Sequence, residues 1–156
     1  MSETNGERIK VTLRWVQILD NLEPFFKEKG EFRFHATVSS ENLGGIRQET
    51  NLPEQGYWAI SDHPAWNKEI VNRVIFDGRV TDHLDIEIIG VELDKSTADD
   101  VLDRYHREFR GPVNQWLGMY GPGGDIPDDQ LSPEAKRDSD PEMMGNWRLC
   151  LLIERA

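Results

Sequence analysis

Acidic side chains suited to metal binding are concentrated between Leu84 and Arg110. An alternating apolar segment there ends in a cluster of carboxylates, formed by Glu92, Asp94, Asp99, Asp100 and Asp103. Carboxylates held close together repel one another, and a hard cation such as calcium relieves the repulsion by accepting about six to eight oxygen ligands. Asp20 and Glu23 follow the first apolar segment and can lie at the same end of a sandwich. A calcium site is therefore one hypothesis.

The same acids have a second interpretation, as the start of a helix. Thr97 and Asp100 have the spacing of a capping box, and acids in a first helical turn interact favourably with the helix dipole. Asp103 would then lie on a solvated helix face. The cluster lacks the D-x-[DN]-x-[DN]-G pattern of a specific calcium loop, so the calcium site and the capped helix are both open at this point.

The histidines provide a third, enzymatic hypothesis. An aspartate directly precedes a histidine in Asp62-His63 and in Asp82-His83, and a carboxylate beside an imidazole can orient it as a base. Sequence neighbours on an extended strand point to opposite faces, however, so neither pair is a ready dyad. The G-x-S-x-G, G-x-x-x-x-G-K and H-E-x-x-H patterns are absent. A hydrolase or metal enzyme would need these side chains to converge, and we expect no enzyme.

Alternating apolar residues predict the strands that would position these groups. Alternation over 9–15 slips in phase at Val16, which indicates a bulge or a strand that crosses between neighbours. Residues 32–38 form a second clean strand, and the polar segment 46–52 is best placed at a sheet edge. A further slip around Gly90 indicates another bulge, since glycine is the expected residue there.

Turn and helix signals complete the pattern. Asp77-Gly78 is a dipeptide that joins hairpin strands, and 70–76 would be the strand before it. Residues 97–110 predict one helix, because apolar residues share one face and Gly111-Pro112 would end it. A long loop is expected over 112–146. The segment 147–153 is apolar on both faces over most of its length, as in a strand in the middle of a sheet.

These elements predict a mainly β fold, an antiparallel β-sandwich of about seven or eight strands with the single helix 97–110 and the loop 112–146. Residues 1–8 would be a polar lead and 9–156 a single domain. Several apolar side chains fall in the predicted loops, where they would either cap one end of the sandwich or form an exposed contact patch: Phe25, Phe26, Trp116, Leu117, Met119 and Tyr120.

Charge and composition restrict the partners. The formal net charge of -11 argues against binding nucleic acid, because phosphate contacts need a positive surface. The same charge disfavours an anionic membrane unless a divalent cation bridges the two. Cys150, the single cysteine, excludes an intrachain disulfide and is expected to be a small buried hydrophobe. No transmembrane segment or signal peptide is expected, and we expect a cytoplasmic protein.

Two segments invite comparison with a known family. K-G-E-F-R-F-H-A-T-V at 29–38 and L-D-I-E-I-I-G-V-E-L-D-K-S-T-A-D-D at 84–100 resemble the calcium- and phospholipid-binding β-sandwich domains of synaptotagmins and protein kinase C. The resemblance places Glu31 at the aspartate of the first top loop of that family. It places Glu92, Asp94 and Asp100 at the spaced aspartates of the third loop, and it implies calcium-dependent binding to a membrane surface.

The function expected from the sequence is that of a non-enzymatic binding module. Calcium is the candidate cofactor, and the candidate ligands are Asp20, Glu23, Glu31, Glu92, Asp94 and Asp100. The partner would be a protein or a calcium-bridged membrane surface. The alternative is a structural or interaction protein without metal, which assembles through the long loop and a sheet edge. The sequence does not predict the oligomeric state.

Overall fold

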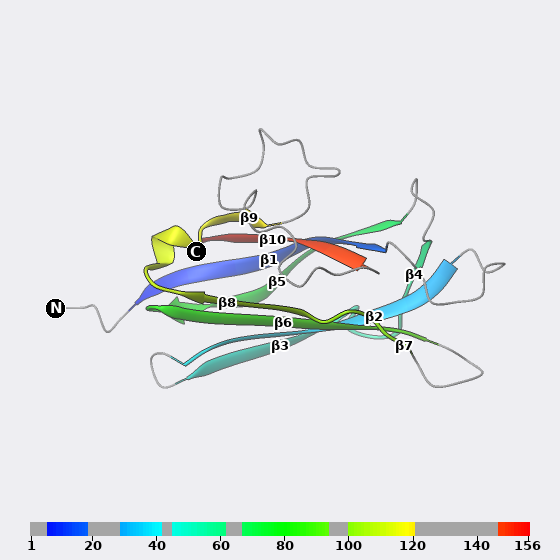
Figure 1. The fold of residues 1–156 in the computed structure, drawn as a ribbon, viewed down its shortest axis with the longest axis horizontal. Coiled ribbons are helices and arrows are strands. Elements are labelled where there is room, and N and C mark those ends of the chain that lie inside the picture. Colours follow the sequence, from blue (N-terminus) through cyan, green and yellow to red (C-terminus); the bar gives the residue numbers. More distant parts are fainter. Residues whose placement is uncertain (1–5, 19–28, 42–44, 62–66, 94–99, 121–146) are drawn as a thin grey trace.

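A computed structural model describes residues 6–18, 29–41, 45–61, 67–93, 100–120 and 147–156 (Figure 1). Almost all regular structure in these ranges is β. The strands are β1 (Glu7–Ile18), β2 (Lys29–Ser40), β3 (Ile46–Leu52), β4 (Trp58–Ser61), β5 (Lys68–Val80), β6 (His83–Glu92), β7 (Asp100–Val101), β8 (Tyr105–Arg110), β9 (Gly118–Tyr120) and β10 (Trp147–Arg155). A short 3-10 turn spans Val113–Gln115. Among these residues, no helix has the length and apolar character needed to cross a membrane.

The strands form two antiparallel sheets that pack face to face (Figure 1). The four-stranded sheet has the order β5-β1-β10-β9. The six-stranded sheet has the order β3-β2-β6-β7, with β4 also paired to β2 and β8 also paired to β6. Every strand pair is antiparallel. The predicted antiparallel sandwich is therefore confirmed, and β3 lies at the sheet edge where its polar sequence placed it.

Alternation in the sequence decides which side chains enter the core between the sheets. In β2, Phe32, Phe34, Ala36 and Val38 are fully buried, while the residues between them are half-buried on the outer face. In β6, Leu84, Ile86 and Ile88 are buried in the same way. Burial of these side chains removes apolar surface from water, which is the main free energy that holds the sheets together.

The phase slip in the first strand is a bulge, as the sequence predicts. Leu13 pairs with Leu151 and Trp15 with Cys150, so Arg14 is an extra residue relative to β10. The bulge moves Val16 and Ile18 into the core and turns Trp15 to the outer face of the four-stranded sheet. β1 begins at Glu7, so the end of the predicted polar lead belongs to this strand.

The last strand lies between two neighbours, as predicted. β10 pairs with β1 on one side and with β9 on the other. Its pairing with β1 runs from Ile9 opposite Arg155 to Ile18 opposite Trp147. The Ala156 N–H also donates to the Arg8 carbonyl at 3.0 Å.

The predicted helix at 97–110 is wrong over the residues that the structure describes. Asp100–Val101 forms β7 and Tyr105–Arg110 forms β8, and both pair with β6. Tyr105 and Phe109 are four residues apart, which fits both the 3.6-residue period of a helix and the two-residue period of a strand. The strand is preferred because β6 would otherwise leave a row of backbone hydrogen-bonding groups without partners. Residues 97–99 lie outside the described residues.

Two further sequence predictions are corrected. Asp77-Gly78 is not a turn, because β5 continues through it to Val80 and the chain turns at Thr81 and Asp82. Gly90 is not a bulge, because β6 keeps an unbroken register with β2 from Asp85 to Glu92. A Cβ added at Gly90 would lie 2.6 Å from Phe34 Cε1 and 2.9 Å from Leu102 Cδ1. Gly90 is therefore where the Phe34 ring packs directly on the backbone.

Side chains close both sides of the sandwich, where the edges of the two sheets meet. On one side, the Gln48 amide of β3 pairs with the edge backbone of β5: Gln48 Nε2 donates to the Asp77 carbonyl at 2.8 Å, and the Asp77 N–H donates to Gln48 Oε1 at 3.0 Å. On the other side, the Trp116 indole donates to the Arg110 carbonyl at 3.3 Å and the Trp147 indole donates to the Asp103 carbonyl. These side chains supply hydrogen bonds that a further strand would otherwise provide.

Three of the four apolar residues after β8 belong to the core or pack against it. Trp116 and Tyr120 are almost fully buried, and Leu117 packs against the core. The interpretation as a cap therefore holds for these three, whereas Met119 is half-buried in β9, opposite the outward-facing Leu152. The other two loop aromatics, Phe25 and Phe26, and residues 121–146 of the predicted loop lie outside the described residues.

Candidate functional site

The topology brings three of the predicted calcium ligands to one end of the six-stranded sheet. Glu92, at the end of β6, pairs with Phe32 of β2 on one side and with Asp100 of β7 on the other. Glu31 is the residue before Phe32, and its carbonyl accepts a hydrogen bond from the Leu93 N–H at 2.8 Å. The other predicted ligands, Asp20, Glu23 and Asp94, lie outside the described residues.

Glu31 and Glu92 nevertheless occupy opposite faces of that sheet. Glu92 is fully buried on the inner face, where a Cβ added to Gly30 would collide with its Oε2. Glu31 is half-buried on the outer face, because it alternates with the inward-facing Phe32. The two carboxylates therefore cannot bind the same ion. Within the described ranges, no group of three or more His, Cys, Asp and Glu side chains is arranged to hold a metal.

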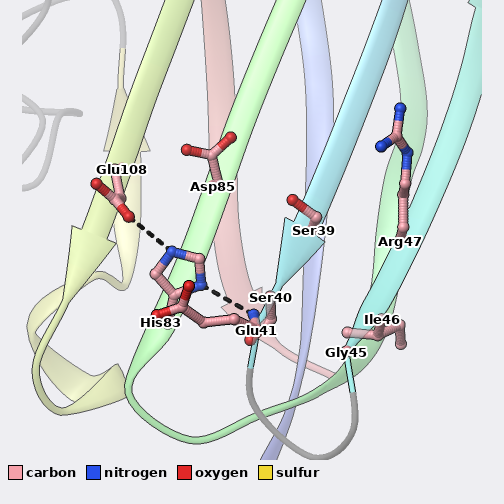
Figure 2. A pocket seen from close by; sticks show the side chains of 9 residues that line it. All are labelled: Ser39, Ser40, Glu41, Gly45, Ile46, Arg47, His83, Asp85 and Glu108. Atoms are coloured by element: carbon pink, nitrogen blue, oxygen red, sulfur yellow. Dashed lines mark hydrogen bonds and ion pairs between the residues drawn. The ribbon is translucent and has the colours of Figure 1, made fainter.

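The opposite end of the same sheet carries a depression on its outer face, with a volume of about 440 Å³ (Figure 2). It lies over the end of β2, the start of β3, the start of β6 and the end of β8. The residues that line it, most of which are of polar types, are Ser39, Ser40, Glu41, Gly45, Ile46, Arg47, His83, Asp85 and Glu108. We call this feature the acidic depression, because three carboxylates line it.

His83 makes two interactions with other residues of the acidic depression, one with Glu108 and one with Glu41 (Figure 2). Its side chain is 6% exposed, and its Nε2 lies 2.7 Å from Glu108 Oε2. The Glu41 backbone N–H donates to His83 Nδ1 at 3.1 Å, so Nδ1 is the acceptor and the proton resides on Nε2. His83 thereby fixes the chain after β2 to strand β8, and both of its ring nitrogens are engaged.

Asp85 and Glu108 lie directly opposite each other on neighbouring strands. Like charges in this position destabilise a sheet unless cations compensate them. Asp85 Oδ1 is 2.6 Å from His106 Nε2. Glu108 accepts from His83 and, at 2.8 Å, from Arg110. The hydrogen bond from His83, with the charge of Arg110, lowers the pKa of Glu108 below its ordinary value.

A third histidine lies on the same outer face. His35 Nδ1 is 2.7 Å from Asn51 Oδ1, and Nε2 is 2.9 Å from Glu49 Oε1. Both partners are acceptors, so both ring nitrogens donate when the imidazole is protonated. The hydrogen bond with Asn51, followed by that with Glu49, raises the pKa of His35. Three strands of this face, β2, β6 and β8, therefore carry a histidine that contacts a carboxylate on an adjacent strand.

The sequence predicts only a small part of this arrangement. Asp82 and His83 are neighbours in sequence, yet His83 binds Glu108, and Asp82 Oδ1 accepts from Thr81 Oγ1 at 3.5 Å. The Asp62-His63 pair lies outside the described residues. Glu108 is missed because a helix was predicted there. The charged Arg107 at an inward-facing position hides the strand period over Tyr105–Arg110 that would have placed Glu108 on the outer face.

We compared the chain with protein-family models, curated proteins and solved structures, and none of them matches it. The geometry of the described residues is therefore the basis for the functional proposal.

Proposed function

We propose that the protein is a non-enzymatic binding module that recognises a cationic group of a partner protein in the acidic depression. The observation that carries the proposal is the pair Asp85 and Glu108, which lie opposite each other in an open hollow that Glu41 also lines. A lysine or arginine side chain would lie between carboxylates that already repel one another. The hydroxyl group of Ser39, which also lines the depression, is an acceptor that can complete its hydrogen bonding.

The charge of the whole chain favours the same partner. A net charge of -11 attracts basic surfaces over a distance and speeds their encounter. One internal partner of the carboxylates is also exchangeable, because Arg110 is 61% exposed and reaches Glu41 at 3.2 Å. A cationic ligand can replace it at little cost, since exposed ion pairs contribute only about 0–1 kcal/mol.

The histidine geometry supports binding over catalysis. A general base needs a ring nitrogen that can accept a proton from the substrate. In His83 the Nδ1 lone pair accepts the Glu41 N–H, and Nε2 donates to Glu108. His35 is likewise held on both sides by Asn51 and Glu49. These rings position strands and loops.

The proposal is tested with a short acetylated peptide that contains two lysines, titrated into ¹⁵N-labelled protein. We expect salt-sensitive chemical-shift changes at the amides around Asp85 and Glu108. Asp85→Asn should weaken binding about tenfold, as the loss of a charge-assisted hydrogen bond does. Glu154→Gln is the matched control, because it removes the same charge from the other sheet, where Glu154 pairs with Lys10. Equal binding of a peptide with glutamine for lysine would refute the proposal.

Calcium-dependent binding is a second proposal, located at the other end of the sheet. Its support is the convergence of the β2, β6 and β7 backbones that carry Glu31, Glu92 and Asp100. Because Glu31 and Glu92 occupy opposite faces, an ion there uses one of them, and only one of Glu31→Gln and Glu92→Gln should weaken it. Calorimetry with millimolar calcium tests this. The absence of both heat and a shift in Tm would rule it out.

A further inference from the structure

The outer face of the four-stranded sheet carries two buried side chains that are separate from the core. Trp15 is 6% exposed and Cys150 is fully buried, and the two residues are directly opposite each other on β1 and β10. The core contains their neighbours Val16, Leu149 and Leu151 but neither of them. The bulge at Arg14 is the cause, because it turns Trp15 outward to meet Cys150.

Cations surround this pair. Lys68 Nζ lies 4.2 Å from the centroid of the Trp15 ring, in a cation–π contact. Burial raises the pKa of the Cys150 thiol to about 11, and the charges of Arg14 and Lys68 act on the same thiol in the opposite direction. Arg14 Nε donates to the neutral amide oxygen of Asn72 at 2.8 Å, which leaves its charge uncompensated by that bond.

A third cation comes from the last strand. Gln17 is opposite Lys68 on one side and opposite Arg148 on the other, so these residues form one row across β5, β1 and β10. Arg148 is two residues before Cys150 on the same strand, so the two side chains lie on the same face of the sheet. Arg148 Nε is buried and has no hydrogen-bond partner among the described residues. A buried guanidinium donor without an acceptor is costly, so this nitrogen is poised to receive one.

We propose that Arg14, Lys68 and Arg148 form an oxyanion-binding site over Trp15, which accepts a carboxylate or phosphate group. Guanidinium groups bind these planar or tetrahedral oxyanions through paired N–H donors, and the ammonium group adds a point charge. The described carboxylates on this face lie at its other end, where Asp77 pairs with Arg8 and Glu154 pairs with Lys10. The site is thus distinct from the acidic depression, which belongs to the other sheet.

The test is a titration of ¹⁵N-labelled protein with inorganic phosphate and, separately, with acetate, each at constant ionic strength set with sodium chloride. We expect a saturable shift of the Trp15 indole resonance with at least one of the two anions. The anion that produces it distinguishes a phosphate ligand from a carboxylate ligand. Arg148→Gln should weaken the binding about tenfold, as expected for the loss of one charge-assisted contact.

Arg79→Gln is the matched control, because Arg79 is exposed on the same face, opposite Arg8 at the far end of β5. It removes the same charge and should leave binding unchanged. If Arg148→Gln fails to fold by circular dichroism, Arg14→Gln replaces it. The proposal is overturned if neither anion shifts the Trp15 indole, if chloride shifts it equally, or if the control weakens binding as much as the site variant. Failure here would leave the lysine-peptide result unaffected.

Discussion

Replacement of Gly90 by alanine tests the central packing feature of the six-stranded sheet. The new methyl group would lie 2.6 Å from Phe34 Cε1 and 2.7 Å from Phe34 Cδ1. The Phe34 ring has little room to move, because its centroid is 4.9 Å from that of Trp147 and 6.2 Å from that of Trp58. Either the ring or strand β6 must shift.

The expected loss follows from two opposing effects. Overpacking of a filled core costs about 1–3 kcal/mol. Replacement of glycine at a compatible backbone conformation gains about 0.4–1 kcal/mol through the unfolded chain. The net decrease in the free energy of unfolding is therefore about 0–2.6 kcal/mol, and its midpoint of about 1.3 kcal/mol lowers the Tm by about 3–5 °C for a domain of this size.

The assay is urea denaturation of a double-mutant cycle with Phe34→Leu. The smaller side chain leaves room for the methyl group, so the coupling between the two substitutions should be favourable by at least about 0.5 kcal/mol. Gly45→Ala is the control: Gly45 has a φ of 81° and no atom within 4 Å of an added Cβ, so its cost comes from the backbone and should not couple to Phe34→Leu. A raised stability for Gly90→Ala, or zero coupling, would refute the packing argument.

Three further predictions concern separate parts of the fold. Cys150 is fully buried with a pKa of about 11, so at pH 8 it should react with a thiol reagent far more slowly than in urea; a fast reaction in the folded protein would contradict its placement. The folded-state pKa of His35 is raised, so its contribution to stability is fully present below about pH 6.5 and is lost as pH rises through the folded value. The free energy of unfolding of His35→Gln, measured at several pH values, should therefore differ most from that of the wild type at acidic pH. A difference that grows as the pH rises would contradict the raised pKa. Gln48→Ala removes both hydrogen bonds to the Asp77 backbone and should cost about 1–3 kcal/mol in urea denaturation; a loss as small as that of the exposed Gln55→Ala would show that water replaces the amide.

The strands could be predicted wherever one face is apolar and the other polar. The second strand is the clearest case, because a polar residue follows each of its apolar residues Phe32, Phe34, Ala36 and Val38. In the structure these four apolar residues are buried and the polar residues between them are not. The bulge in the first strand was equally readable from its change of phase. Both features depend on local alternation alone, which the sequence contains.

The strand β8 could not be predicted because a charged residue occupies an inward-facing position. Arg107 has the same parity as Tyr105 and Phe109, which hides the period of two. Its guanidinium carbon lies 4.9 Å from the centroid of Phe109 and 4.5 Å from that of Tyr120, so the cation covers aromatic faces. Tyr120 is brought there by β9, a contact that no local pattern reveals.

The acidic depression was beyond sequence reasoning for a related reason. Asp85 and Glu108 are separated by a segment that reads as a helix, and only the pairing of β6 with β8 places them opposite each other. Likewise, the row that joins Lys68 to Arg148 exists only because β1 lies between β5 and β10. Charges from distant strands form these sites, whereas two of the predicted calcium ligands, Glu31 and Glu92, lie on opposite faces of one sheet.

The pairing of β1 with β10 has a consequence for how the chain folds. Among the described strands, β1 is synthesised first and β10 last, yet they are neighbours from Ile9 opposite Arg155 onward. During translation β1 can pair with β5, but its other edge must wait for the rest of the chain. Pairing across such a long separation is intrinsically slow and leaves a strand edge exposed in the meantime. The nascent chain should therefore be most vulnerable to aggregation just before β10 emerges from the ribosome.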